Sequence, residues 1–155
     1  MKVYIIGSLR NPKIPEVANT LQSEGFDAFD SWFSCGPEAD DKWREHEKFR
    51  GHTYAEALNG YAAGHIFQFD KSHLDTSDAA VLVMPAGKSA HLELGYMIGK
   101  GKPGFILFDG EPERWDVMTL FATGVFFKID ELIAALRGYN SYIVQPAFLR
   151  PWGHQ

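Results

Sequence analysis

Cysteine, long apolar runs and an excess of positive charge are all scarce in this sequence. Cys35 is the only cysteine among 155 residues, so no disulfide can form within the chain, and an oxidising compartment is not indicated. No stretch approaches the ~20 apolar residues that a membrane-spanning helix needs. A net charge of −5, from 15 Lys and Arg against 20 Asp and Glu, argues against an electrostatic surface for polynucleotides or anionic lipids. We therefore expect a cytoplasmic protein that binds neither a membrane nor a nucleic-acid polymer.

Metal-ligand motifs are also lacking. The paired-histidine zinc motif needs a second histidine four residues after the first. His46-Glu47 has Arg50 at that position, which excludes this motif. The remaining histidines form no dense cluster, and a single cysteine cannot supply a thiolate site. We expect chemistry that needs no metal and no cofactor.

Aromatic residues, by contrast, are abundant: 12 Phe, 6 Tyr and 4 Trp make up 14% of the chain. The rest of the composition, with 45% hydrophobic and 23% charged residues, is that of an ordinary globular protein and excludes a disordered or fibrous chain. A chain of 155 residues is expected to form one domain, 1–155. The aromatic surplus indicates a use beyond core packing.

Short apolar runs of strand length alternate with helical patterns along the chain. The runs predict strands at 3–6, 26–29, 79–84, 104–108 and 125–129. The helical patterns predict helices from 15 to a stop at Gly25, in two segments between 42 and 64 (the second at 53–63), and at 67–75, 89–98, 114–121 and 130–136, the last capped by Asp130. The segments 31–41 and 138–155 have no period and predict a loop and an irregular tail. This alternation predicts a three-layer α/β fold of the Rossmann or flavodoxin type, with a central parallel sheet of about five strands.

Glu93 is the most informative single residue. Ser89 is a plausible N-cap for the helix 89–98, which would place Glu93 near the first turn, at the loop edge of the sheet. Ligands of open α/β sheets bind at that edge. A carboxylate between apolar Leu92 and Leu94 could act there as a nucleophile. The alternative is a purely structural acid that complements the helix dipole.

Two further segments carry candidate site residues. Gly7, Ser8 and Arg10 follow the first predicted strand and offer flexible backbone, a hydroxyl and a cation to a sugar hydroxyl or a phosphate. Asp70 follows Phe67 and Phe69, and a carboxyl beside apolar surface can have a raised pKa and donate a proton. The alternatives are a turn with a solvated arginine and an ordinary acid at the end of a helix.

Three segments together resemble the nucleoside 2-deoxyribosyltransferase family, which includes related deoxynucleoside 5′-monophosphate N-glycosidases. The first is 4–10, Tyr-Ile-Ile-Gly-Ser-Leu-Arg, similar to the opening strand and loop of the family. The second is 70–78, in which Asp70 stands eight residues before the Asp that opens a strand. The third is 91–96, His-Leu-Glu-Leu-Gly-Tyr, similar to the segment that holds the nucleophilic glutamate of the family. The resemblance extends from Tyr4 to about Leu136.

This resemblance implies that Glu93 attacks C1′ of a deoxyribose while Asp70 protonates the leaving base and Tyr4 orients Glu93. The substrates would be a 2′-deoxynucleoside, or its 5′-monophosphate, and a free nucleobase. The remaining implied roles concern substrate contacts. Gly7, Ser8 and Arg10 would lie near the 5′ end of the sugar, Ser89 and His91 are further candidates for that contact, and Trp32 and Phe33 would stack on the base.

The resemblance also implies a homo-oligomer, because the family completes its site with a neighbouring subunit near the region 124–127. Departures from the family leave alternatives open. Gly87 stands where transferases often have a second acid, and Asn11-Pro12 replaces glycines usual in the monophosphate hydrolases. Base transfer, hydrolysis of a monophosphate, and non-catalytic nucleotide binding on the same fold therefore all remain open.

Overall fold

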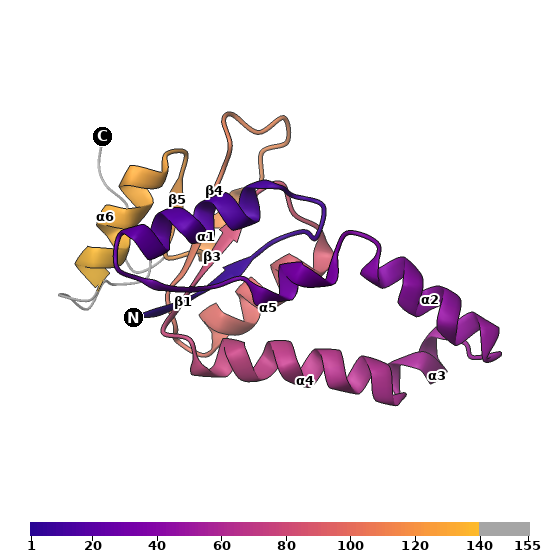
Figure 1. Cartoon of the computed structure of the whole chain (residues 1–155). Helices are drawn as coiled ribbons and strands as arrows, with labels where there is room; N and C mark the ends of the chain where they lie inside the picture. The colour runs from indigo at the N-terminus through magenta and orange to yellow at the C-terminus, as the bar shows by residue number, and fades with distance from the viewer. Residues whose placement is uncertain (140–155) are drawn as a thin grey trace.

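The computed structural model describes residues 1–139 and shows a sheet with helices on both faces (Figure 1). The strands are β1 (Lys2–Ile6), β2 (Asp27–Phe29), β3 (Ala79–Val83), β4 (Gly104–Leu107) and β5 (Gly124–Phe126). The α-helices are α1 (Lys13–Ser23), α2 (Ala39–Phe49), α3 (Tyr54–Leu58), α4 (Tyr61–Thr76), α5 (Lys88–Gly99) and α6 (Ile129–Tyr139). Two 3-10 helices are η1 (Ser31–Cys35) and η2 (Val117–Phe121). Most of the tail predicted at 138–155 lies outside the described residues.

The sheet has five parallel strands in the order β2-β1-β3-β4-β5, which confirms the predicted α/β fold. Its register is fixed by pairs such as Tyr4 with Ala80 and Ala80 with Gly104. The chain runs outward from β1 to β2 and then returns past β1 to β3. Such a reversal leaves a crevice at the carboxyl ends of β1 and β3, which is the usual ligand position in open α/β sheets.

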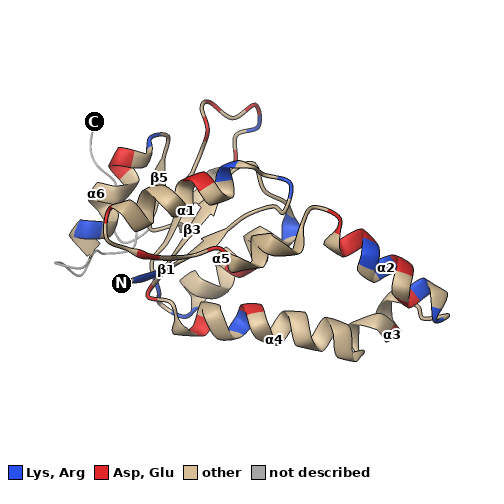
Figure 2. Cartoon of the chain, viewed as in Figure 1, with Lys and Arg blue, Asp and Glu red and all other residues tan. Residues whose placement is uncertain are grey.

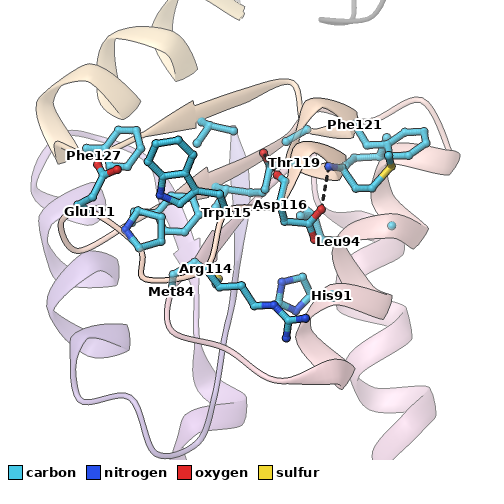
Figure 3. Close-up of a pocket in the computed structure, with 18 of the residues that line it drawn as sticks. Met84, His91, Leu94, Glu111, Arg114, Trp115, Asp116, Thr119, Phe121 and Phe127 are labelled. Atoms are coloured by element: carbon cyan, nitrogen blue, oxygen red, sulfur yellow. Dashed lines mark hydrogen bonds between the residues drawn. The ribbon is translucent and has the colours of Figure 1, made fainter.

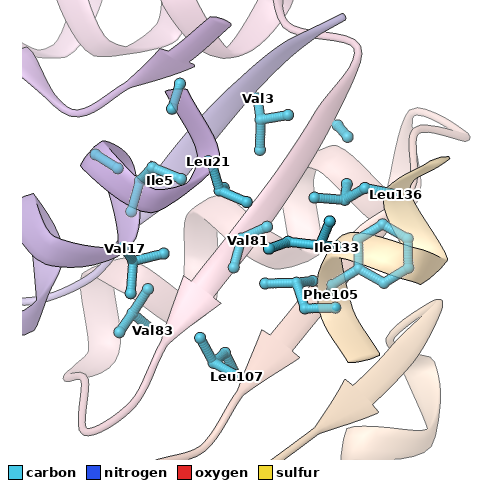
Figure 4. Packing of buried hydrophobic residues seen from close by; sticks show 14 of the residues in the cluster. Val3, Ile5, Val17, Leu21, Val81, Val83, Phe105, Leu107, Ile133 and Leu136 are labelled. Carbon is cyan, nitrogen blue, oxygen red and sulfur yellow. The ribbon is translucent and has the colours of Figure 1, made fainter. Parts of the chain in front are cut away.

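Strand side chains alternate between two hydrophobic layers, one on each face. Val3 and Ile5 point toward α1 and α6 and join the layer in Figure 4, together with Val81. Tyr4 and Ile6 point to the other face and pack with residues of α4 and α5. Because alternation has a period of two, the apolar run of β1 fixes which face receives Tyr4.

The helices α2, α3 and the first half of α4 extend away from the sheet (Figure 1). The single helix predicted at 53–63 is wrong, because Gly60 separates α3 from α4 in an extended conformation. A Cβ at Gly60 would lie 3.2 Å from the carbonyl oxygen of Ala57, so a side chain fits poorly at this break. Thr53 is the N-cap of α3, where its hydroxyl and Glu56 form a capping box.

Two predicted helix caps are wrong because the hydrogen-bonded ladder starts earlier than the sequence suggests. The first helical bond of α5 ends on the carbonyl of Gly87, so Gly87 is the N-cap and Ser89 lies inside the helix. In α6 the ladder starts at the carbonyl of Lys128, so Asp130 belongs to the first turn. Glu93 thereby stands two residues, about half a turn, further into α5 than predicted.

The last elements before α6 are shorter than predicted. The helix expected at 114–121 is a 3-10 turn that begins at Val117, where the Asp116 carboxylate accepts a hydrogen bond from the backbone. The strand expected at 125–129 covers Gly124–Phe126, because α6 starts soon afterwards. Within residues 1–139 no helix combines the length and the apolar character needed to cross a bilayer.

Close packing of α5 on β4 predicts that Gly104→Ala destabilises the fold. The added Cβ would lie 2.7 Å from Leu94 Cδ1 and 2.9 Å from Ile98 Cγ1, both on α5. We expect urea unfolding to give a free energy of unfolding lower by about 1–3 kcal/mol. Gly64→Ala on α4 is the control, because its Cβ meets nothing within 4 Å and alanine favours a helix. Equal stability of Gly104→Ala and wild type would contradict this packing.

Candidate active site

Tyr4, Asp70 and Glu93 come from three separate elements, and the fold brings them together on one face of the sheet. Tyr4 lies on β1, Asp70 on α4 and Glu93 on α5. Tyr4 is buried, with 1% of its surface exposed, whereas the two acids are half-buried. The charges of Asp70 and Glu93 both raise the pKa of Tyr4, and that of Asp70 raises the pKa of Glu93. The three groups are thus close enough to interact electrostatically.

Burial dominates the electrostatics of Glu93. It raises the pKa of the Glu93 carboxyl to about 8, and the negative charge of Asp70 adds to the rise. Burial also raises the pKa of Asp70. Two neighbouring carboxyl groups with raised pKa values tend to share a proton near neutral pH, which gives one ionised and one protonated partner. Such a pair can provide a nucleophile and a proton donor at the same time.

Tyr4 has a fixed ring and a protonated hydroxyl. Its ring packs in the α4–α5 layer and contacts Phe29 at a centroid distance of 5.3 Å. Burial first, and then the charges of Glu93 and Asp70, push the pKa of Tyr4 far above its usual value. A phenol that stays protonated next to two carboxyl groups can donate a hydrogen bond to one of them.

Aromatic rings connect α4 to β2 beside Asp70. The His73 imidazole stacks on Phe29 at 3.9 Å with an interplanar angle of 14°, and Phe69 lies 6.2 Å from Phe29. Lys2 Nζ lies 3.0 Å from His73 Nδ1. Burial, and then the charge of this lysine, lower the pKa of His73. Phe69, the neighbour of Asp70 in the sequence, thus also contacts Phe29 of the edge strand β2.

The loop after β1 lies at the crevice, but its arginine points to α2. The Ser8 hydroxyl accepts a hydrogen bond from the backbone N–H of Arg10 at 3.1 Å. The Arg10 side chain, 72% exposed, forms an ion pair with Asp41 at 3.5 Å. The structure therefore places Gly7 and Ser8 at the end of β1 and leaves Arg10 on the surface.

Trp32 and Phe33 belong to η1, within the segment predicted as a loop. The Trp32 indole N–H donates a hydrogen bond to the carbonyl oxygen of Ile5 at 2.8 Å, and its ring packs against both hydrophobic layers. Phe33 packs against the layer under α1 and α6. The structure does not bring Phe33 to the face that holds Glu93.

A cavity of about 1440 Å³ lies beside α5 (Figure 3). Predicted residue His91 lines it, and Figure 3 shows the Arg114 side chain directed toward that imidazole. Most other lining side chains are apolar and come from α5 and the segment 108–127, including Leu94, Trp115 and Phe121. Tyr4, Asp70 and Glu93 are not among the lining residues, so the cavity does not contain the acidic pair.

Sequence reasoning missed most of this cavity wall. Trp115 is 80% exposed and Phe121 63% exposed, and both belong to the segment between β4 and β5. Their closeness in the sequence, between two predicted strands, was the available signal. Ser89, in the first turn of α5, is exposed. Within the described residues, no three His, Cys, Asp or Glu side chains are arranged to hold a metal ion.

The comparisons with known proteins identify a related architecture. No family model matches the sequence, and no curated protein matches it. Among solved structures, a 2-deoxyribosyltransferase from the psychrotolerant bacterium Bacillus psychrosaccharolyticus superposes with a TM-score of 0.58. The match covers 86% of this chain and 90% of that protein, with 15% of residues identical. The chain has the fold of a 2-deoxyribosyltransferase. The resemblance based on the three sequence segments is thus confirmed at the level of this deoxyribosyltransferase fold.

The raised pKa of Glu93 predicts that its ionisation destabilises the folded protein. An acid with a raised pKa in the folded state keeps its proton there while the unfolded chain releases it, so stability falls as pH rises from about 4.5 to about 8. Glu93→Gln removes this penalty. We expect the difference in free energy of unfolding between Glu93→Gln and wild type to shift by about 2 kcal/mol in favour of the variant when the pH is raised from 5 to 8.

Urea unfolding at several pH values measures this gain. Glu131→Gln serves as control because Glu131 is exposed on α6. A pH dependence that is the same for Glu93→Gln, Glu131→Gln and wild type would contradict the burial of Glu93.

Proposed function

We propose that the protein cleaves the N-glycosidic bond of a 2′-deoxynucleoside and transfers the deoxyribose to another nucleobase. The observation that carries this proposal is the meeting of Glu93, Asp70 and Tyr4 on the α4–α5 face, with both carboxyl pKa values raised. The deoxyribosyltransferase fold supports the same conclusion, since the structural neighbour is described as a biocatalyst for nucleoside synthesis.

The proposed reaction is a double displacement at C1′. The ionised Glu93 carboxylate attacks C1′, the bond from C1′ to the base nitrogen breaks with its electron pair on nitrogen, and Asp70 donates a proton to the base. A deoxyribosyl ester of Glu93 remains. A nitrogen of the second base then attacks C1′, loses its proton to Asp70 and releases Glu93. Two displacements retain the configuration at C1′, as in retaining glycosidases with two carboxyl groups.

The active form needs Glu93 ionised and Asp70 protonated, whereas burial and the charge of Asp70 favour a proton on Glu93 in the free protein, so substrate binding has to shift this proton. Because the two carboxyls interact, they titrate as a pair, and the rate follows the population of the form with a single shared proton. Tyr4, which stays protonated, donates a hydrogen bond that favours the charge on Glu93 and fixes the direction of its attack. Substrate binding completes the exclusion of water from this pair.

The substrate contacts follow from the position of the crevice. Gly7 and Ser8, at the end of β1, lie where a sugar hydroxyl would bind, and Arg10 can turn from Asp41 to a 5′-phosphate. Ser89 and His91, in the first turn of α5, are the further candidates for the 5′ end. The reach of Arg10 is the observation that favours a second function, hydrolysis of a deoxynucleoside 5′-monophosphate, in which water replaces the second base.

Incubation with a deoxynucleoside and a different free base tests the proposal. We expect a new deoxynucleoside, detected by chromatography, and a loss of at least about 1000-fold in rate for Glu93→Ala, because no other group replaces the nucleophile. The same panel with 5′-monophosphates separates the two functions: free deoxyribose 5-phosphate without a new nucleotide indicates hydrolysis. If the protein binds these compounds tightly but turns over none of them, both base transfer and hydrolysis are wrong. That result would support a non-catalytic nucleotide-binding protein.

The covalent intermediate gives a second, independent prediction. Rapid quenching in acid without an acceptor base should reveal an intact mass increased by one deoxyribosyl group, located on the peptide that contains Glu93. Asp70→Asn should slow formation of this adduct by about 100-fold, the usual contribution of a proton donor. A wild-type enzyme that turns over substrate but never shows the adduct would contradict the double displacement.

We also propose that the protein acts as a homo-oligomer. Tyr61 and Phe67 on the outer half of α4 are 99% and 60% exposed, and Figure 2 shows no charged residue on that half of the helix. Trp115 and Phe121 are also largely exposed, and exposed large apolar side chains that gather in a patch mark protein–protein contacts. Light scattering should show a dimer or larger species, and Tyr61→Glu with Phe67→Glu should shift it toward the monomer. A wild-type monomer at the working concentration would refute this proposal.

A further inference from the structure

Hydrophobic burial attaches α4 only weakly to the rest of the protein. The helix has 16 residues, all of them described, and Leu74 is its single buried side chain. Asp70 belongs to this helix, on the side that faces Tyr4 and Glu93. A helix with so little buried apolar surface must be held by other contacts if its catalytic side chain is to keep a fixed position.

Beside the ring contacts of Phe69 and His73 with Phe29, a polar attachment comes from Asp75. Its Oδ1 accepts hydrogen bonds from the Tyr96 hydroxyl at 2.5 Å and from Lys100 Nζ at 2.6 Å, both on α5. Its Oδ2 accepts from Lys71 Nζ, one turn earlier on α4, at 2.9 Å. These three donors hold the pKa of Asp75 well below its usual range, so the carboxylate stays ionised at any pH at which the enzyme would work.

Further cationic contacts strengthen the same junction. Lys100 Nζ and Lys71 Nζ lie 5.2 Å and 5.8 Å from the centre of the Tyr96 ring. Lys102 Nζ, just before β4, donates to the carbonyl oxygen of Asp75 at 2.6 Å. The end of α4 is therefore fixed by its side chain to α5 and by its backbone to the segment that leads into β4.

The junction lies close to both carboxyl groups along rigid helices. Asp70 precedes Asp75 by five residues on α4, and Glu93 precedes Tyr96 by three residues on α5. At 1.5 Å per residue, these separations are about 7.5 Å and 4.5 Å along the helix axes. A movement of α4 at Asp75 is thus transmitted to Asp70 almost undamped.

We propose that Asp75 and Tyr96 are positioning residues that set the separation between the Asp70 and Glu93 carboxyl groups. The proposal rests on the double displacement described above. In enzymes with two carboxyl groups, a separation of about 5–5.5 Å suits direct nucleophilic attack, whereas about 6.5–9.5 Å leaves room for water. A loosened junction therefore slows formation of the ester and exposes it to water.

Tyr96→Phe and Asp75→Asn test the proposal. Tyr96→Phe keeps the ring and removes one hydrogen bond, so the variant should fold. We expect kcat to fall about 10- to 100-fold with KM changed less than about threefold, and hydrolysis to rise relative to base transfer. Asp75→Glu, which restores the carboxylate, should recover part of the loss. The control is Glu24→Gln, which removes an ion pair with Arg137 far from the junction and should leave kcat and the product ratio unchanged.

A readout that needs no turnover separates this proposal from the proposed function. Carboxyl ¹³C NMR gives the pKa of Glu93 in each variant, and we expect it to fall toward the usual glutamate value in Tyr96→Phe as Asp70 moves away and water enters. Absence of base exchange and hydrolysis in the wild type would refute the reaction but not this shift. A Glu93 pKa and a kcat both unchanged in folded Tyr96→Phe and Asp75→Asn would overturn the positioning role.

Discussion

A parallel sheet must be covered on both faces, and this requirement organises the whole molecule. The run Val3–Ile6 is buried on both sides, so its odd residues are committed to the layer under α1 and α6 and its even residues to the layer under α4 and α5. Tyr4 reaches the acidic pair for this reason. Its polar end lies at a position that core packing alone would fill with an aliphatic residue.

The strands could be predicted from the sequence because their information is local. Apolar runs of four to six residues closed by glycine, proline or charge give β1, β3 and β4 within a residue or two. The candidate carboxyls were also predictable, since Asp70 and Glu93 stand out as acids in apolar surroundings and their spacing resembles a known family. Their interaction across α4 and α5 is the part that the structure adds.

Other features depend on long-range packing and could not be predicted in the same way. Gly87 caps α5 through its backbone, so no capping side chain marks the start of the helix. The resemblance implies that Trp32 stacks on the base from an irregular loop, but in the structure its indole N–H reaches the carbonyl of Ile5, a partner 27 positions away. The cavity beside α5 depends on how the segment 108–127 folds back over that helix, and the local patterns in this segment do not determine where it packs.

The inner half of α4 packs against α5 and the sheet, whereas its outer half extends away from the sheet beside α3. The helix is one continuous rod of 16 residues, about 24 Å long, with Asp70 and Asp75 toward one end and the exposed rings of Tyr61 and Phe67 toward the other. A rod held near one end acts as a lever. Any contact made at the outer rings therefore bears on the same rigid helix that carries the Asp70 carboxyl nearer its inner end.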